Sequence, residues 1–265
     1  MSHYETIIIS PLKQSYLFLK NIQGSVFRPS HEKSFSMKTG DYLQHIAFDS
    51  VIFGFSGEKL KILILEYHNT GLFALPGGFV QKDENLDDAV RRGLQERTGL
   101  NHIYLEQFHT FGDVARYKPE IMAQIIAANN LPGVDLSWLL NRFVSVAYYA
   151  LIDYEEVVPT PDALSDSCTW YEVDYLPTLM LDHAHIVQKA LETLRENISR
   201  KLVGGKLLPP RFTMKELQQV YEAILGEKLH RGTFQRKMLS LGGLKRHEKQ
   251  YSGAAHKAPF LYSFK

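Results

Sequence analysis

The chain has 265 residues, enough for one large domain and one small one, and its 45% hydrophobic and 22% charged composition is ordinary for a globular protein. No run approaches the roughly 18 apolar residues of a membrane-spanning helix, the first residues lack the pattern of a secretory signal, and the single Cys168 excludes an internal disulfide. The net charge of +1 conceals an acidic body, with 17 Lys and Arg against 25 Asp and Glu in residues 1–200, and a basic tail, with 13 against 4 in residues 201–265.

Residues 1–45 are interpreted as an N-terminal extension of unknown role. After it, runs rich in β-branched and aromatic residues predict strands, and apolar residues at helical spacing predict helices. The strand expected at 73–80 is broken by a glycine-rich bend. Gly99 ends the helix that is expected at 86–98. The expected strands are 46–55, 60–66, 73–80, 104–111, 143–152 and 169–173, and the expected helices are 86–98, 119–128, 136–142 and 182–199.

Residues 78–100 resemble the Nudix box, the pattern G-x5-E-x7-R-E-U-x-E-E-x-G-U in which U is an aliphatic residue. The box requires a strand, a loop and a helix in that order, which agrees with the expected elements. The resemblance implies an α/β fold, an α/β/α sandwich on a mixed sheet, over residues 46–202. The matching positions are Gly78, Glu84, Arg92, Leu94, Glu96, Gly99 and Leu100.

Two departures from the box fall on its metal ligands. In the family, Glu residues at the positions of residues 93, 96 and 97 bind a divalent metal from one face of the helix. This chain has Gly93, Glu96 and Arg97, so the formal charge of the three positions changes from −3 to 0. Mg²⁺ requires anionic oxygen ligands and is repelled by a guanidinium, so we expect no metal, no cofactor and no catalytic residue here.

The residues that hold the box together are retained. Glu84 and Arg92 can pair across the junction of loop and helix, and Gly78 and Gly99 keep their backbone roles. A domain that keeps its scaffold and loses its catalytic carboxylates is interpreted as a binding domain. The sequence therefore predicts a Nudix fold that recognises a small molecule without hydrolysing it.

A winged helix-turn-helix is predicted for residues 211–265, after a linker at 203–210 that contains glycine and proline. A capping box at Thr213 and Glu216 opens the first helix, and Gly226 closes it. A turn at 227–231 leads to a second helix at 232–241. A strand from residue 244, a loop and a strand at 259–264 then complete a β-hairpin, the wing.

This domain carries the side-chain types that bind DNA: Arg for guanine, Gln for adenine and Lys for phosphates. An acidic body with a basic tail is the charge distribution expected when only the tail contacts a polyanion. Use of the domain for protein binding is the alternative. The predicted DNA-binding residues are Arg231, Thr233, Gln235, Arg236 and Lys237 at the second helix, and Lys245, Arg246, Lys249 and Lys257 in the wing.

Over about 220 residues the combination resembles the Nudix-related transcriptional regulators of the NrtR/AraR type. The resemblance implies a cytoplasmic bacterial homodimer that binds a palindromic operator. Its Nudix domain would sense ADP-ribose or a sugar such as arabinose. It is carried by Asp182-His183, Leu207-Leu208-Pro209, Phe212-Thr213, Glu216-Leu217-Gln218, Tyr221-Glu222, Leu225-Gly226, Phe234, Arg236-Lys237 and Leu261-Tyr262-x-Phe264.

Under the leading hypothesis the protein is a repressor, and an effector in the Nudix pocket changes the angle between the two winged helices of the dimer. Arg116 and Arg142 are the candidates for an anionic ligand, whereas core packing or surface pairing is the alternative role of each candidate. The predicted effector-binding residues are Phe79, Glu96, Arg97, Asp113, Arg116 and Arg142.

Two other functions stay open at this point. In the first, Asp83, Asp87 or Asp88 restores a metal site, and the protein is a Nudix hydrolase of nucleoside diphosphate derivatives with an accessory domain. Metal-dependent turnover would establish it. In the second, the protein binds DNA constitutively and the Nudix domain only dimerises, so no effector would change DNA binding.

Overall fold

The structure is a computed structural model that describes residues 39–129, 135–198, 202, 206–250 and 258–265. Most of the predicted N-terminal extension and the predicted DNA-binding residue Lys257 lie outside these ranges. None of the described helices is long and apolar enough to cross a membrane.

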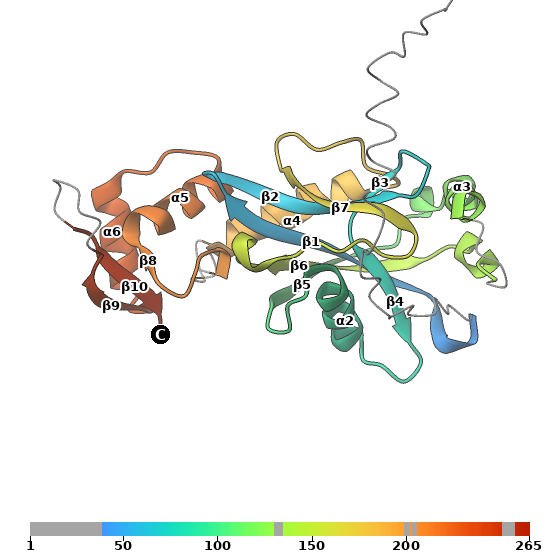
Figure 1. Cartoon of the computed structure of the whole chain (residues 1–265), viewed down its shortest axis with the longest axis horizontal. Helices are drawn as coiled ribbons and strands as arrows, with labels where there is room; N and C mark the ends of the chain where they lie inside the picture. The colour runs from blue at the N-terminus through green and yellow to red at the C-terminus, as the bar shows by residue number, and fades with distance from the viewer. Residues whose placement is uncertain (1–38, 130–134, 199–201, 203–205, 251–257) are drawn as a thin grey trace, which may run out of the picture. The chain divides into compact units, whose positions relative to one another are not determined.

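A mixed sheet forms the centre of the Nudix domain (Figure 1). Its longest strand, β1 (Tyr42–Ser56), pairs with the parallel strand β6 (Val144–Leu151) on one side and the antiparallel strand β2 (Lys59–Tyr67) on the other. The turn between β1 and β2 contains Gly57 and Glu58, both with positive φ, as a tight hairpin turn requires. Beyond β6 lies β5 (Tyr104–Phe111), and beyond β2 lies β7 (Ser165–Glu172).

The strand predicted at 73–80 is broken, as expected, but the break falls at Leu75 and Pro76 rather than at the glycines. The segment forms two strands, β3 (Phe73–Ala74), which pairs with β2, and β4 (Gly77–Gln81), which pairs with β1. The chain changes partner at Pro76, whose carbonyl accepts a 2.8 Å hydrogen bond from the amide of Ser50. Proline has no N–H to donate, which favours a break in the ladder at this position.

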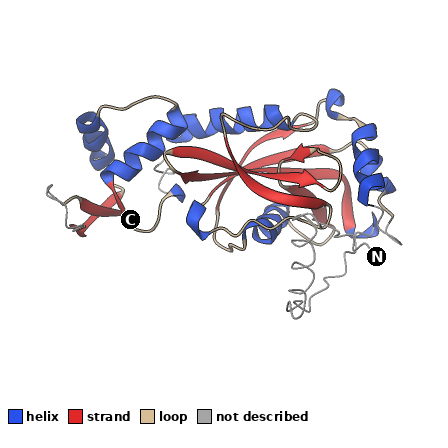
Figure 2. Ribbon diagram, turned by 45° about the horizontal axis from the view of Figure 1, so that its top comes forward, coloured by secondary structure: helices blue, strands red, loops and turns tan. Residues whose placement is uncertain are grey.

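Helices cover both faces of the sheet, as Figure 2 shows. Alternate residues of β1 point to opposite faces: Val51 and Phe53 pack with α4 (His183–Ile198), and Phe48 and Ile52 pack with α2 (Leu86–Thr98). Because both faces are buried here, the runs at residues 51–53 of β1 and 62–65 of β2 are apolar throughout rather than alternating. The predicted α/β/α sandwich on a mixed sheet is thus confirmed.

The remaining helices of this domain are short. The helix predicted at 119–128 is α3 (Pro119–Asn129), but the one predicted at 136–142 is a single 3₁₀ turn, η3 (Ser137–Leu140). Two further 3₁₀ turns, η2 (Val114–Arg116) and η4 (Tyr154–Glu156), follow β5 and β6. The seven residues predicted as a helix at 136–142 are too few to complete two turns of α-helix, and so short a helix is marginally stable.

The C-terminal part is a winged helix with a small sheet in the order β8-β10-β9. Its elements are β8 (Phe212–Thr213), α5 (Met214–Leu225), α6 (Arg231–Ser240), β9 (Leu244–Lys249) and β10 (Phe260–Phe264). The capping box of Thr213 and Glu216 is present, and Gly226 has the positive φ of 76° that ends α5. The two-residue strand β8 was not predicted, because so short a strand has no sequence periodicity. The predicted domain boundaries remain a prediction.

Candidate functional site

The loop and helix of the Nudix box are held together by Glu84 and Arg92, as predicted. Arg92 donates hydrogen bonds of 2.8 and 3.0 Å to the two carboxylate oxygens of Glu84, and a third of 3.0 Å to the carbonyl of Phe79. The guanidinium lowers the pKa of Glu84, and the carboxylate raises the pKa of Arg92. The scaffold of the box is therefore intact.

The ring of Phe48 occupies the space between β4 and α2. A Cβ atom added to Gly78 would lie 2.7 Å from Cζ of Phe48, and one added to Gly93 would lie 3.0 Å from the same atom. Both distances are shorter than ordinary van der Waals contact, so a side chain at either position would require the ring of Phe48 to move. The packing of this ring therefore opposes the Glu that the box has at position 93.

Arg97, at another metal-ligand position, is paired rather than open. Its side chain is 10% exposed, donates a 2.8 Å hydrogen bond to Asp162 and lies 3.8 Å from Glu96. Its buried Nε has no hydrogen-bond partner among the described residues. Burial raises the pKa of the nearby Tyr67 hydroxyl, and the negative charge of Asp162 raises it further. Burial also raises the pKa of the Cys168 thiol to about 12. At position 97 a guanidinium thus stands in place of the carboxylate of the box, and Asp162 is its counter-ion.

Arg116 lies in a buried polar network at the end of β5. It donates to Asp182 at 3.0 and 3.2 Å, to Asp49 at 3.4 Å and to the carbonyl of Phe143 at 3.2 Å. Ser145 adds a 2.5 Å hydrogen bond to Asp49. The side chain of Arg116 is 7% exposed, so its positive charge is neutralised inside the domain by two carboxylates.

His183 completes this network. Its Nδ1 accepts a 3.0 Å hydrogen bond from the amide of Leu75, so in the neutral ring the proton is on Nε2, 3.7 Å from Asp49. Burial lowers the pKa of His183 despite Asp49. The dipeptide Asp182-His183 was singled out in the sequence only through the family resemblance, and Asp49, Ser145 and Asp162 were not singled out at all.

The other predicted effector residues lie in two places. Phe79 packs in an aromatic cluster, with its ring centroid 4.6 Å from that of Trp138 and 5.3 Å from that of Phe143. Asp113 caps η2 by accepting from the amide of Ala115, and Arg142 donates to the carbonyl of Gly112. The structure therefore brings Asp113, Arg116 and Arg142 to one corner after β5, whereas Glu96 and Arg97 lie on α2.

In the winged helix, Glu222 fixes the turn between α5 and α6. It accepts hydrogen bonds from Gln218 (2.8 Å), the amide of Leu229 (2.9 Å) and Lys228 (3.0 Å). These donors lower the pKa of Glu222 to about 2, the hydrogen bond from Gln218 contributing most. The turn is thus held by a charge-assisted network, which sets the direction in which α6 leaves α5.

The predicted DNA-binding side chains are presented outward by α6 and the wing. On α6, Phe234 and Met238 are buried in the core. Gln235 and Lys249 are half-buried. The exposed members of the predicted set are Arg231, Thr233, Arg236, Lys237, Lys245 and Arg246.

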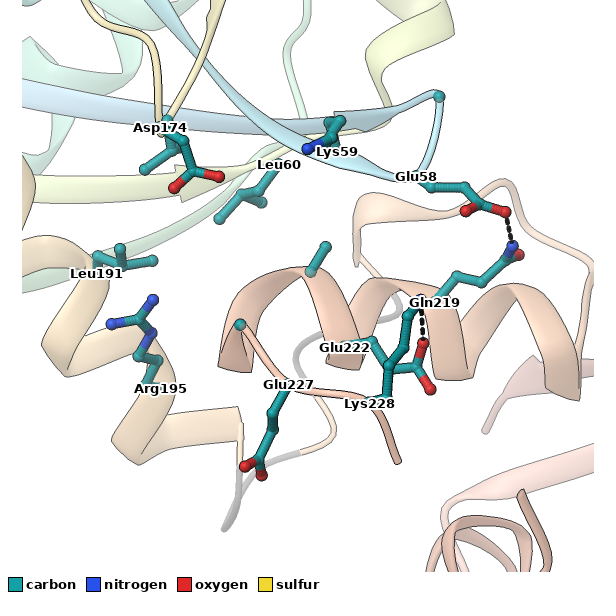
Figure 3. Close-up of a pocket in the computed structure, with 14 residues that line it drawn as sticks. Glu58, Lys59, Leu60, Asp174, Leu191, Arg195, Gln219, Glu222, Glu227 and Lys228 are labelled. Atoms are coloured by element: carbon teal, nitrogen blue, oxygen red, sulfur yellow. Dashed lines mark hydrogen bonds and ion pairs between the residues drawn. The ribbon is translucent and has the colours of Figure 1, made fainter. Parts of the chain in front are cut away.

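A groove of about 400 Å³ lies where α5 packs against α4 and β2 (Figure 3). Two contacts bridge it. Arg195 of α4 donates a 2.8 Å hydrogen bond to the carbonyl of Ile224 in the last turn of α5, and Gln219 of α5 donates to Glu58 in the β1–β2 turn. A cation at the carboxyl end of a helix also interacts favourably with the helix dipole. The first helix of the helix-turn-helix is thus attached to the Nudix fold.

Comparisons with known proteins identify both parts. The family described as "NrtR DNA-binding winged helix domain" matches residues 204–264, and the NUDIX domain family matches residues 43–190. A relative from Acinetobacter baylyi, named ADPR responsive transcriptional repressor NtrR, is 32% identical over 224 residues, which is 82% of this chain and 80% of that protein. The crystal structure of Shewanella oneidensis NrtR complexed with a 27mer DNA has a TM-score of 0.66 at 28% identity, covering 84% of this chain and 94% of that one.

A hydrolase is also similar, over a shorter range. An ADP-ribose pyrophosphatase of Methanocaldococcus jannaschii is 34% identical over 89 residues, and these cover 32% of this chain and 50% of that enzyme. The chain thus spans half the length of this relative but four fifths of the repressor. Of these two relatives, the repressor is the one that matches over most of this chain.

Replacing Arg116 with Ala is expected to lower the free energy of unfolding by about 3–5 kcal/mol, because Asp49 and Asp182 would be left as buried charges without their cation. Urea unfolding measures the change. Arg142→Ala is the matched control, since Arg142 is exposed, and should cost less than about 1 kcal/mol. Equal losses in the two variants would contradict a structural role for the buried network.

Replacing Glu222 with Gln is expected to destabilise the chain in a pH-dependent manner. Because folding lowers the pKa of Glu222 from 4.5 to about 2, its stabilisation is complete above the ordinary pKa and is lost as the pH falls towards 2. The difference in unfolding free energy between wild type and variant should be about 1 kcal/mol at neutral pH and shrink in acid. Urea unfolding at pH 7 and pH 3 tests this, and a constant difference would refute it.

Proposed function

Since the chain belongs to the NrtR family of Nudix-related transcriptional regulators, we propose that it represses transcription by binding operator DNA and that ADP-ribose in its Nudix domain releases the DNA. The observation that carries the proposal is a Nudix box with an intact scaffold and altered metal positions in the same chain as a helix-turn-helix with exposed cations. The first feature favours recognition of a nucleotide without turnover, and the second favours a polyanion as partner.

The loss of hydrolysis is the first part of this proposal. A metal ligand at residue 93 would require the ring of Phe48 to move, and Arg97 with its partner Asp162 leaves position 97 occupied by an ion pair. Glu96 remains, but one carboxylate provides too few anionic oxygens for Mg²⁺. Of the nearby carboxylates, Asp87 accepts a hydrogen bond from Tyr148, and Asp88 accepts one from Asn85.

The effector is the second part. The named relative responds to ADPR, and ADP-ribose has a diphosphate that can accept hydrogen bonds from a guanidinium. We assign this role to Arg97, where the diphosphate would compete with Asp162 for the same donors. Phe79, Glu96, Asp113, Arg116 and Arg142 are proposed to line the remainder of the site. The corner at Arg116 suits ribose hydroxyls better than phosphates, because Arg116 donates hydrogen bonds to two carboxylates, Asp49 and Asp182, whereas Arg97 donates to one, Asp162.

DNA recognition is the third part. A homodimer would place two α6 helices in successive major grooves of a palindromic operator, roughly 34 Å apart. Arg236 and Lys237 are exposed near the middle of α6, and Arg231 begins the helix. We propose that Thr233, Gln235 and Arg236 contact base edges and that Arg231, Lys237, Lys245, Arg246, Lys249 and Lys257 contact phosphates.

Fluorescence anisotropy on DNA from upstream of the protein's own gene and of neighbouring genes tests the function. We expect tight binding to one sequence that weakens steeply with salt and is released by ADP-ribose. Arg236→Ala should weaken binding by about tenfold or more, because a bidentate base contact is worth about 1–3 kcal/mol. Lys189→Ala, which changes a partly exposed lysine on α4, is the control and should bind as wild type.

Other outcomes discriminate the alternatives. Selective DNA binding that neither ADP-ribose nor pentoses change would mean a constitutive DNA-binding protein. Release of AMP from ADP-ribose in the presence of Mg²⁺, without sequence-selective DNA binding, would mean a hydrolase. Either result would overturn the proposal.

Communication between the domains is proposed to run through α4. This helix begins at His183, beside the Asp49–Arg116–Asp182 network, and carries Arg195 near its other end. A ligand that shifts the network would move the start of α4, and the hydrogen bond from Arg195 would carry that displacement to α5. The groove in Figure 3 leaves space for α5 to tilt against α4.

Replacing Arg195 with Ala is expected to weaken this coupling. The ratio of the DNA dissociation constants with and without ADP-ribose, typically about 5- to 150-fold in allosteric proteins, should fall towards one. Binding of DNA alone should change less than about threefold, because α6 and the wing are untouched. Anisotropy with Lys189→Ala as the matched α4 control measures both quantities, and a wild-type ratio in Arg195→Ala would exclude this route.

A further inference from the structure

Two cations of the wing converge on one aromatic ring. The guanidinium carbon of Arg246 lies 4.7 Å from the ring centroid of Phe260, and the ammonium nitrogen of Lys249 lies 5.3 Å from it. Both distances are within the range in which the electron-rich face of an aromatic ring attracts a cation. Arg246 is exposed and Lys249 is half-buried, so both charged groups remain accessible to a ligand.

A β-bulge brings these residues to the same face of the hairpin. Tyr262 lies opposite Arg246, whereas Phe260 lies opposite Lys249, and the register shifts by one residue between these pairs. In a regular strand, residues 246 and 249 would point to opposite faces. The extra residue of β9 reverses the alternation, so that both cations share the face that carries Phe260 and Tyr262.

The other polar groups of β9 are engaged elsewhere. Glu248 pairs with Arg211, and His247 shares a 2.8 Å hydrogen bond with Ser263 on the opposite face. Phe260 is itself partly buried and packs against the hydrophobic core. The ring is therefore a fixed platform, and no carboxylate of β9 neutralises the two cations that it holds.

We propose that Phe260 is a positioning residue for DNA binding, whose ring holds Arg246 and Lys249 as one pre-organised clamp for backbone phosphates. This inference rests on the proposed function. Two like charges held beside one ring repel each other, and an anion between them relieves that repulsion. Because the ring restricts both long side chains before DNA binds, less conformational entropy is lost on binding.

Salt-dependent anisotropy on the preferred DNA tests the clamp with four variants. Phe260→Leu keeps an apolar side chain but removes the aromatic face, and we expect it to bind about three- to tenfold more weakly with an unchanged salt slope, since both charges remain. Phe260→Tyr should bind as wild type. Arg246→Ala/Lys249→Ala should lower the slope by about two, and adding Phe260→Leu to that pair should cause no further loss.

Three results would overturn the clamp: wild-type binding by Phe260→Leu, an undiminished effect of Phe260→Leu in the background without both cations, or no effect of removing those cations. Thermal unfolding of each variant establishes that the fold is retained, and the Tyr variant separates a lost ring face from a disturbed core. Lys245→Ala, on the opposite face with no ring contact, should lower the slope by no more than about one. Selective DNA binding by the wild type, and its weakening in Arg236→Ala, test the proposed function without involving Phe260. Failure of the clamp is therefore distinguishable from failure of the function.

Discussion

The buried ion pairs of Arg116 hold together parts of the chain that are far apart in sequence. Its guanidinium joins Asp49 of the central strand to Asp182 at the start of α4, with 7% of its side chain exposed. Removing these charges from water is costly, and close hydrogen-bonded geometry offsets that cost. The network also sets the position of His183, the first residue of α4. The same helix carries Arg195, which donates to the carbonyl of Ile224 in α5, so α4 contacts both this network and the winged helix.

A second constraint explains why the Nudix box keeps its shape with altered metal positions. Phe48 packs between Gly78 and Gly93, and this ring contributes to the apolar core on the α2 face. Gly93 thus packs closely against this ring and also lacks the carboxylate of the box. Arg97 is stabilised by Asp162, a residue outside the box. These contacts at the altered metal positions support the proposed recognition of ADP-ribose.

Sequence patterns predicted the sandwich, the helix-turn-helix and the Glu84–Arg92 pair, because apolar periodicity, capping residues and the Nudix box act over short distances along the chain. They did not predict the partners of Arg116 and Arg97, since these carboxylates lie 65 to 67 residues away and no local pattern marks them. The bulge in β9 was also missed, because simple alternation places Arg246 and Lys249 on opposite faces. The predicted site residues were therefore chosen by their chemical type, whereas their pairing required the fold.

The central claim is that this Nudix domain binds ADP-ribose without a metal and leaves it intact. Isothermal titration calorimetry of the full chain with ADP-ribose in excess EDTA, followed by chromatography of the recovered ligand, measures both properties. The account predicts saturable binding in EDTA, little change when Mg²⁺ replaces EDTA, and unaltered ADP-ribose in both samples. Binding that requires Mg²⁺, together with conversion to AMP and ribose phosphate, would contradict it.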